Sequence, residues 1–256
     1  MDPLAFKYFS FSPYNYAANN PIQFIDPDGR DVVGVTKEDG KKVIEDINKV
    51  FANKKFSSFR DMISLAKDGK TLNKIDGNAY AEVLKSEGFS EADLALMETV
   101  KNTINSSDVH LAEYVSADDA LSESQIEAFG IRKELVDNLK EPITAGFLGD
   151  QTTKTNNGTR SIVVEGGKYA NDYFNTAIKG YVMTNPGRRV GIMMHEVVGH
   201  GRSLALGRGA HNQHQDAIRL ENMVLRVMGH GEVQRTGRDH GSREQIKNAS
   251  QIPDYR

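Results

Sequence analysis

Apolar residues recur at helical spacing through most of residues 31–140. The pattern predicts helices that end near Asn53, at Asp68-Gly69 and at Gly88, followed by a helix that Ser90 opens with a capping box. A shorter helix is expected over 131–139. The apolar stripes are Val43, Ile44, Ile47, Val50 and Phe51; Phe59, Met62, Ile63 and Ala66; Tyr80, Val83 and Leu84; and Leu94, Met97, Val100 and Ile104. No chemical motif lies in this region, which we expect to be a helical scaffold.

From residue 141 onward the pattern becomes β-rich. Residues 143–148, 161–165 and 181–183 are expected to be strands, as is the alternating segment 109–115. The polar stretch 152–159 predicts a hairpin loop. Helices are expected over 188–204 and 213–228. The predicted fold class is therefore α+β, with a small sheet packed against the 188–204 helix and the 213–228 helix lying opposite.

Composition narrows the function classes. The chain has 256 residues, 38% hydrophobic and 26% charged, as in ordinary globular proteins. Lys plus Arg is 32 and Asp plus Glu is 35, so the net charge of −3 argues against a protein that mainly neutralises phosphates. The absence of cysteine excludes disulfides, thiol catalysis and cysteine-ligated metals. No apolar run is long enough to predict a membrane span, and the start, Met1 to Leu4, shows no Sec signal peptide.

Six of the seven histidines follow position 194, and two of them frame the candidate site. The motif His-Glu-Val-Val-Gly-His occupies 195–200, among apolar residues that predict a buried helix. Buried His and Glu side chains are costly unless they are paired or bind a metal. Two imidazoles on one helix can hold Zn²⁺, and Glu196 between them is placed to take a proton from the attacking water. His195 and His200 are thus candidate ligands and Glu196 the candidate base.

The spacing of these histidines requires a distorted helix. In a regular α-helix a residue at i+4 is displaced by ~40° around the axis, whereas one at i+5 is displaced by ~140°. His200 stands at i+5 from His195, so a regular helix would point the two rings apart. A π-bulge absorbs one extra residue and restores the alignment, and Gly199 tolerates that distortion best. We therefore predict an i→i+5 widening across 195–200.

Residues 1–30 have a different character, rich in aromatics, Asn and Pro. Asp2-Pro3-Leu4, the segment SPYNYAANNPI over 12–22, and the closing DPDG over 26–29 resemble the end of the RHS repeat-associated core of bacterial polymorphic toxins. In that family the core is a shell that encloses a variable C-terminal toxin. The resemblance implies that the toxin begins at Arg30 or Asp31, giving three regions: 1–30, the helical scaffold 31–140 and a catalytic core over 141–256.

The motif over 195–200 carries a second resemblance. Its pattern, H-E-x-x-G-H, is similar to the zinc motif of dipeptidyl peptidase III, where the two histidines bind zinc and the glutamate is the base. The downstream segment 217–222, AIRLEN, resembles the AIRxEN helix of zincin-like toxin peptidases. This resemblance implies a zincin-like fold with Glu221 as the third zinc ligand. The residues alone leave His214 or Asp216 open as the ligand; Asp216 could instead orient a ligand imidazole.

During peptide hydrolysis the carbonyl oxygen of the scissile bond becomes an oxyanion. Zinc peptidases commonly supply a His or a Tyr, in addition to the metal, to stabilise it. His230, His240 and Tyr255 are the candidates, and spacing does not choose between them. His240 is favoured slightly because Asp239 and the neighbouring glycines indicate an ordered turn. His211 and His214, three residues apart, could also hold a metal, although loop histidines are commoner.

These features together predict a zinc-dependent peptidase that is the toxin module of an RHS-type antibacterial effector, secreted or delivered into a target cell. The expected partners are a protein or peptide substrate, a cognate immunity protein and the parent RHS shell, with neither nucleic acid nor membrane insertion. Two alternatives remain. A metal-dependent nuclease would use Arg235, Arg238, His240 and Arg243 on phosphate. A non-catalytic binding module would bind no metal.

Overall fold

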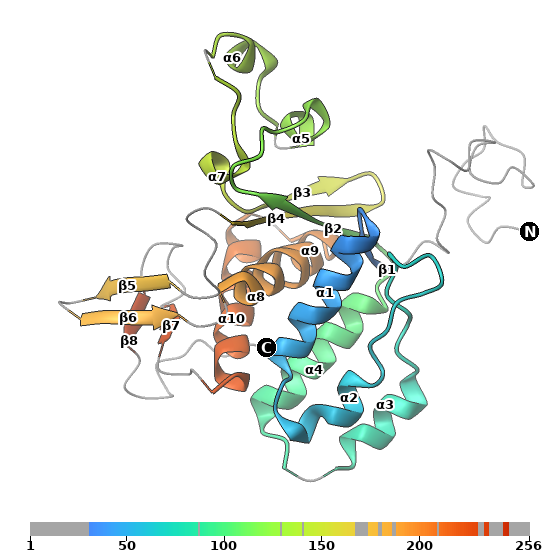
Figure 1. Ribbon diagram of the computed structural model, residues 1–256. Coiled ribbons are helices and arrows are strands. Elements are labelled where there is room, and N and C mark those ends of the chain that lie inside the picture. The colour runs from blue at the N-terminus through green and yellow to red at the C-terminus, as the bar shows by residue number, and fades with distance from the viewer. Residues whose placement is uncertain are drawn as a thin grey trace, which may run out of the picture.

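A four-stranded sheet organises the protein, which we describe from a computed structural model (Figure 1). The structure describes residues 31–86, 88–128, 130–139, 141–166, 174–178, 181–185, 188–208, 210–229, 233–235 and 243–245. The sheet order is β1-β2-β4-β3, with β1, β2 and β4 parallel and β3 antiparallel to β4. Its strands are β1 (Asp31–Gly34), β2 (Val109–Ser116), β3 (Gln151–Thr155) and β4 (Gly158–Glu165). The sheet takes two strands from either side of residue 140.

Most of the helices that the sequence predicts between residues 31 and 104 are present, but they differ in extent. Two capping boxes start the long helices α1 and α4: Thr36 pairs with Asp39, and Ser90 with Asp93. The helices of this region are α1 (Lys37–Val50), the 3₁₀ turn η3 (Lys54–Phe56), α2 (Ser57–Arg60), α3 (Gly77–Leu84) and α4 (Glu91–Ile104). The helix expected to end at Asp68-Gly69 is wrong, because only Phe59 of its apolar stripe lies in a helix, the short α2, and residues 61–70 form turns and loop. The strand β1 was not predicted, because four buried residues carry no periodicity that separates a strand from a helix.

The C-terminal elements confirm most of the predicted pattern. The strand expected at 181–183 is present as β6 (Tyr181–Asn185), but its expected place in the same sheet as 109–115 and 161–165 is wrong, because it pairs with β5 (Phe174–Ile178) in a separate two-stranded sheet. The helix expected over 188–204 is α8 (Arg188–Met193), a π-helical segment η4 (Met194–His200) and α9 (Gly201–Ala205). The helix expected over 213–228 is α10 (Ala210–Val227). Two short strands, β7 (Val233–Arg235) and β8 (Arg243–Gln245), pair with each other.

The expected strand over 143–148 is wrong. This segment forms the short helix α7 (Ala145–Leu148), which follows α5 (Glu123–Ala128) and α6 (Lys133–Asp137). The backbone N–H of Gly146 donates to the carbonyl of Ala117 at 2.8 Å. An added Cβ on Gly146 would lie 2.8 Å from that oxygen, so the close approach depends on glycine. The segment thus docks by its backbone on the loop after β2 and makes no ladder.

The loop expected over 152–159 is also wrong in extent, although its turn is confirmed. Gln151–Thr155 is the strand β3, and the turn lies at 156–157. Threonine is β-branched and has a high strand propensity, and a polar strand suits the edge of a sheet. The polar residues of this segment therefore reflect its position at the sheet edge, and they do not exclude a strand.

Two hydrophobic clusters cover the two faces of the sheet. Ala112 and Val163 belong to the larger cluster, which the helices α1, α4, α8 and α10 complete. Val115, Ile162 and Val164 point to the opposite face and pack with Leu121 and Ala145. This alternation follows from the two-residue period of a strand. The α+β class is compatible with this mixed architecture, in which the long helices gather on one face (Figure 1).

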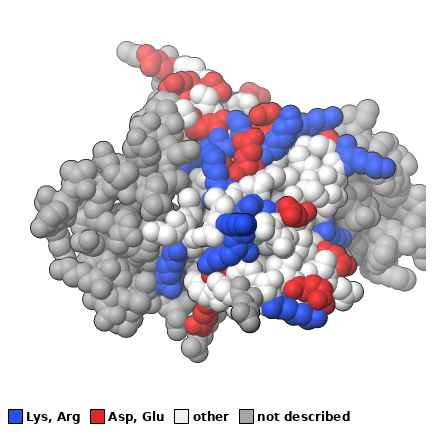
Figure 2. All heavy atoms as spheres, turned by 60° about the horizontal axis from the view of Figure 1, so that its bottom comes forward, with Lys and Arg blue, Asp and Glu red and all other residues white. Residues whose placement is uncertain are grey.

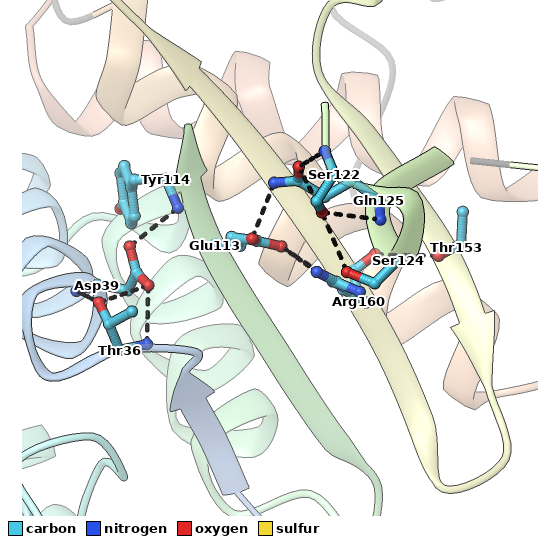
Figure 3. A network of polar contacts seen from close by, with 9 residues as sticks. All are labelled: Thr36, Asp39, Glu113, Tyr114, Ser122, Ser124, Gln125, Thr153 and Arg160. Atoms are coloured by element: carbon cyan, nitrogen blue, oxygen red, sulfur yellow. Dashed lines mark hydrogen bonds and ion pairs between the residues drawn. The ribbon is translucent and has the colours of Figure 1, made fainter. Parts of the chain in front are cut away.

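Side-chain contacts fix the sheet to its surroundings (Figure 3). Asp39 caps α1 by accepting the backbone N–H of Thr36, and its other oxygen accepts the N–H of Tyr114 on β2. On the opposite face, Arg160 on β4 donates twice to Glu113 on β2, at 2.6 and 2.9 Å. The contacts of Asp39 with Tyr114 and of Arg160 with Glu113 join elements distant in sequence and so stabilise the relative placement of α1, β2 and β4.

A buried ion cluster joins α1, β2 and α8, and we call it the Asp46 cluster (Asp46, Tyr114 and Arg189). The Tyr114 hydroxyl donates to Asp46 at 2.8 Å, and Arg189 Nε donates to the same carboxylate at 3.0 Å. The carboxylate of Asp46 is fully buried. Burial raises its pKa, although the hydrogen bond and charge of Arg189 act in the opposite sense.

Among the residues that the structure describes, no helix combines the length and apolarity that crossing a membrane requires.

Candidate metal centre

The candidate centre lies where the helix α8–η4–α9 changes its hydrogen-bond pattern. Within η4 the helix is π-helical, and the Gly201 N–H donates to the carbonyl of Glu196, five residues earlier. The rings of His195 and His200 lie with their centroids 4.9 Å apart at an interplanar angle of 72°. The predicted i→i+5 widening is confirmed, and it places both imidazoles on one side of the helix.

His195, Glu196 and His200 form a compact group of donors. Their nearest ligand atoms all lie within 4.8 Å of one another, so the group could hold a metal ion. His195 and Glu196 are each only 5% exposed, whereas His200 is partly exposed. His200 is therefore the most exposed member of the group.

The helix α10 supplies a second carboxylate. Glu221 Oε2 lies 3.3 Å from His195 Nδ1, and Glu221 is 6% exposed. Its position depends on Gly199, because a Cβ on that residue would lie 2.8 Å from Ala217 Cα and 3.0 Å from Ala217 Cβ. Ala217 and Glu221 are four residues apart on α10 and share one face. Gly199 thus serves both the helix distortion and the close approach of the helix that carries Glu221.

The donor set suits a first-row divalent cation. Imidazole nitrogen and carboxylate oxygen are ligands that Zn²⁺ accepts. Two ligands at ~2.0 Å from a tetrahedral ion are separated by ~3.3 Å, which is the separation between His195 Nδ1 and Glu221 Oε2. The separation of these two atoms is therefore compatible with both binding one metal ion.

Glu196 lies against the sheet as well as against the histidines. The Thr152 hydroxyl, on β3, is 2.6 Å from Glu196 Oε2. Burial raises the pKa of Glu196 above that of an ordinary glutamate, while His195 and the hydrogen bond from Thr152 act in the opposite sense. A buried carboxylate whose pKa is raised is a stronger base than a solvated one, and such groups concentrate at functional sites.

Sequence reasoning did not single out Thr152 or His110. His110 on β2 is fully buried, and its Nδ1 lies 2.9 Å from the Thr159 hydroxyl. Burial lowers the pKa of His110 to about 4, so this imidazole is neutral at pH 7. A Cβ on Gly201 would lie 3.1 Å from His110 Nδ1, so this histidine packs directly behind the C-terminal end of η4. Neither residue belongs to a motif, and the alternation of β2 was the only available signal for His110.

The other predicted site residues are distributed as follows. Asp216 accepts the Ser203 hydroxyl at 2.9 Å and pairs with Arg208 and Arg219. His211 and His214 lie on α10, but their side chains are not among those described. His230, His240 and Tyr255, the candidates for the oxyanion, lie outside the described residues, as do residues 1–30 with the RHS-like segment.

Comparisons with protein-family models, with curated proteins and with solved structures find no match for this chain.

Proposed function

We propose that this protein is a zinc-dependent peptidase. The observation that carries the proposal is the π-helical segment, which brings His195 and His200 together with Glu196 between them. A regular helix would separate these rings, and a distortion of this kind is characteristic of functional sites. The proposal assigns His195, His200 and Glu221 as zinc ligands, and a zincin-like arrangement of the sheet and the two helices.

Zinc bound there would polarise the scissile carbonyl and make a water molecule more acidic. Glu196 accepts a proton from the attacking water at its carboxylate and passes it to the leaving amine. Its raised pKa, caused by burial, suits both steps. The dry surroundings of His195 and Glu196 strengthen every electrostatic interaction among these groups.

The sheet offers a place for a peptide substrate. Strand β3 forms one edge of the described sheet and carries Thr152, the residue that contacts Glu196. An extended peptide can add to such an edge through main-chain hydrogen bonds. A substrate paired with β3 would pass close to Glu196, as cleavage requires.

We further propose that the peptidase is the toxin of an RHS-type effector delivered into a target cell. The RHS-like motifs of residues 1–30 support this role. A cognate immunity protein would protect the producing cell, most simply by covering the site. Positive and negative side chains are interspersed on the face drawn in Figure 2, and the net charge of −3 favours a protein substrate over a nucleic acid.

The proposal is tested by expressing the full chain in a bacterial cytoplasm. We expect wild type to slow growth and Glu196→Gln, which keeps the shape of the side chain, to leave growth normal. Purified protein is then offered unfolded casein, plasmid DNA and RNA, with and without a chelator. Chelator-sensitive cleavage of casein alone supports the peptidase, whereas cleavage of nucleic acid favours the nuclease. Equal toxicity of wild type and Glu196→Gln would exclude the proposed chemistry.

A further inference from the structure

Thr152 and Ser161 form a pair of hydroxyl groups beneath the candidate base. They are direct partners in the antiparallel register of β3 and β4, and their oxygens lie 2.9 Å apart. Both side chains point to the sheet face that carries η4, since Ser161 is fully buried and Thr152 reaches Glu196. The pair therefore connects the edge of the sheet to the site.

The donors and acceptors of this pair can be assigned. The Thr152 oxygen lies 2.6 Å from Glu196 Oε2 and 3.0 Å from the Glu196 carbonyl oxygen. That carbonyl already accepts the Gly201 N–H of the π-helix. A hydroxyl has one proton, and the shorter contact is to the carboxylate, where a hydrogen bond to a charged acceptor is the stronger one. Thr152 thus donates to Oε2, and Ser161 donates to Thr152.

We infer that Thr152 is a positioning residue for Glu196, an inference that rests on the proposed peptidase function. Its hydroxyl holds Oε2 and so fixes the rotation of the carboxylate. The other oxygen, Oε1, is left as the proton acceptor. Ser161 orients the Thr152 hydroxyl, and the pairing of β3 with β4 sets the position of both.

Threonine suits this position better than serine or valine. Its branched Cβ restricts rotation about χ1, so the hydroxyl is held in place. Valine has nearly the same shape without the hydroxyl and would leave the buried Oε2 without this donor. If Thr152 only attached β3 to the helix, its loss would lower the free energy of unfolding and leave the rate of proton transfer unchanged.

The neighbouring residue Thr153 provides a matched control. It lies on the same strand, but its side chain points to the opposite face, because successive residues of a strand alternate. Its hydroxyl makes only a 3.5 Å contact to the Arg160 carbonyl. Thr153→Val therefore removes the same hydroxyl from β3 without touching Glu196.

The experiment compares Thr152→Val, Thr152→Ser and Thr153→Val as full chains. We expect Thr152→Val to lower kcat on casein by about tenfold, the equivalent of one hydrogen bond to a charged group. KM and zinc affinity should stay within about twofold of wild type. Thr152→Ser should restore most of kcat, and Thr153→Val should match wild type. If Thr152→Val does not fold, Thr152→Ala carries the same expectation.

The inference would be overturned if folded Thr152→Val, or Thr152→Ala in its place, had the kcat of wild type. It would also be overturned if the loss of activity were accounted for by loss of zinc. A second readout is independent of activity. In crystals of Thr152→Val, the Glu196 carboxylate should be rotated relative to its orientation in wild-type crystals, and an unchanged orientation would also overturn the inference. If wild type cleaves no protein, the proposed function fails, and this comparison of orientations still decides the role of Thr152.

Discussion

Two buried polar groups contact the helix α8–η4–α9, and they differ in chemistry. The Asp46 cluster sets a carboxylate against a guanidinium and a phenol, with Arg189 Nη2 2.9 Å from the carboxylate. The candidate metal centre gathers two imidazoles and two carboxylates, with His195 and Glu221 3.3 Å apart. The first set neutralises its own charge, whereas the second consists of metal-ligand types.

The difference shows that burial of ionisable groups does not by itself indicate a functional site. Structural ion pairs shift pKa values as active sites do, and burial raises the pKa of both Asp46 and Glu196. Only the candidate metal centre lies on a distorted helix, and only there does a glycine admit a second helix at close range. We therefore expect the Asp46 cluster to govern stability and the centre to govern metal binding.

The variant Asp46→Ala is the strongest test of whether the Asp46 cluster governs stability and not metal binding. Among the described residues, removal of Asp46 leaves Arg189 only the longer ion pairs to Glu165 at 3.5 Å and Glu45 at 3.7 Å, so unfolding should become easier by about 3 kcal/mol. Zinc content of the folded protein should not change. Glu45→Ala is the control, because this neighbour is exposed and lies 3.7 Å from Arg189; its effect should stay within about 0.5 kcal/mol. Denaturant unfolding measures both, and loss of zinc in folded Asp46→Ala would remove the distinction.

The next largest effect is expected from His110, whose lowered pKa should make the free energy of unfolding depend on pH. Burial lowers the pKa of His110 to about 4, so between that pH and about 6.5 the unfolded state binds more protons than the folded state. Its contribution is complete above pH 6.5 and is lost as pH falls, by about 3 kcal/mol in total.

The measurement compares the unfolding free energy of wild type and His110→Asn from pH 4 to pH 7. The variant should be less stable at pH 7, and the difference should shrink as pH falls. A difference that is constant over this range would show that His110 titrates normally.

Glu221 and Asp216 test which acid of α10 belongs to the centre. Glu221→Ala should weaken zinc binding by more than about 100-fold, because loss of a ligand should exceed the ~10–100-fold effects of outer partners, and Asp216→Ala should weaken it less. Asp216 contacts Ser203 and Arg208, so its removal should act mainly on local stability. Competition with a chromophoric chelator gives both affinities. The opposite order would move the third ligand from Glu221 to Asp216.

The smallest effect is expected at Gly199. The added methyl of Gly199→Ala would meet Ala217 and push η4 from α10, which should cost about 1–3 kcal/mol and weaken zinc binding through Glu221. Gly191→Ala on α8 is a matched control, since its Cβ would have nothing within 4 Å. That variant should be neutral or slightly stabilised. Equal behaviour of the two variants would show that the close approach at Gly199 is unimportant.

Some features of the structure could be predicted because they depend only on residues that are close together in the sequence. The π-helical widening was predicted from two histidines five residues apart on an apolar helix, and the capping box of α4 from Ser90 three residues before Asp93. The strand expected over 143–148 failed because docking of Gly146 on Ala117 is a tertiary contact.

The contacts of the site were less accessible to prediction. The Thr152 hydrogen bond depends on the pairing of β3 with β4 and on the placement of η4, neither of which a short polar segment reveals. The role of Gly199 in helix packing likewise depends on where α10 lies. Spacing identified the residues of the candidate metal centre, whereas the tertiary structure determines what holds them in place.

The zinc content of the purified protein tests the central claim most directly. Wild type and Glu196→Gln should each retain about one Zn²⁺ per chain, because the base is not a ligand, whereas His200→Ala should retain almost none. Elemental analysis after extensive dialysis, with an anomalous-scattering peak between His195 and His200, gives the result. Wild-type protein that binds no metal, or His200→Ala with stoichiometric zinc, would contradict the assignment of this site.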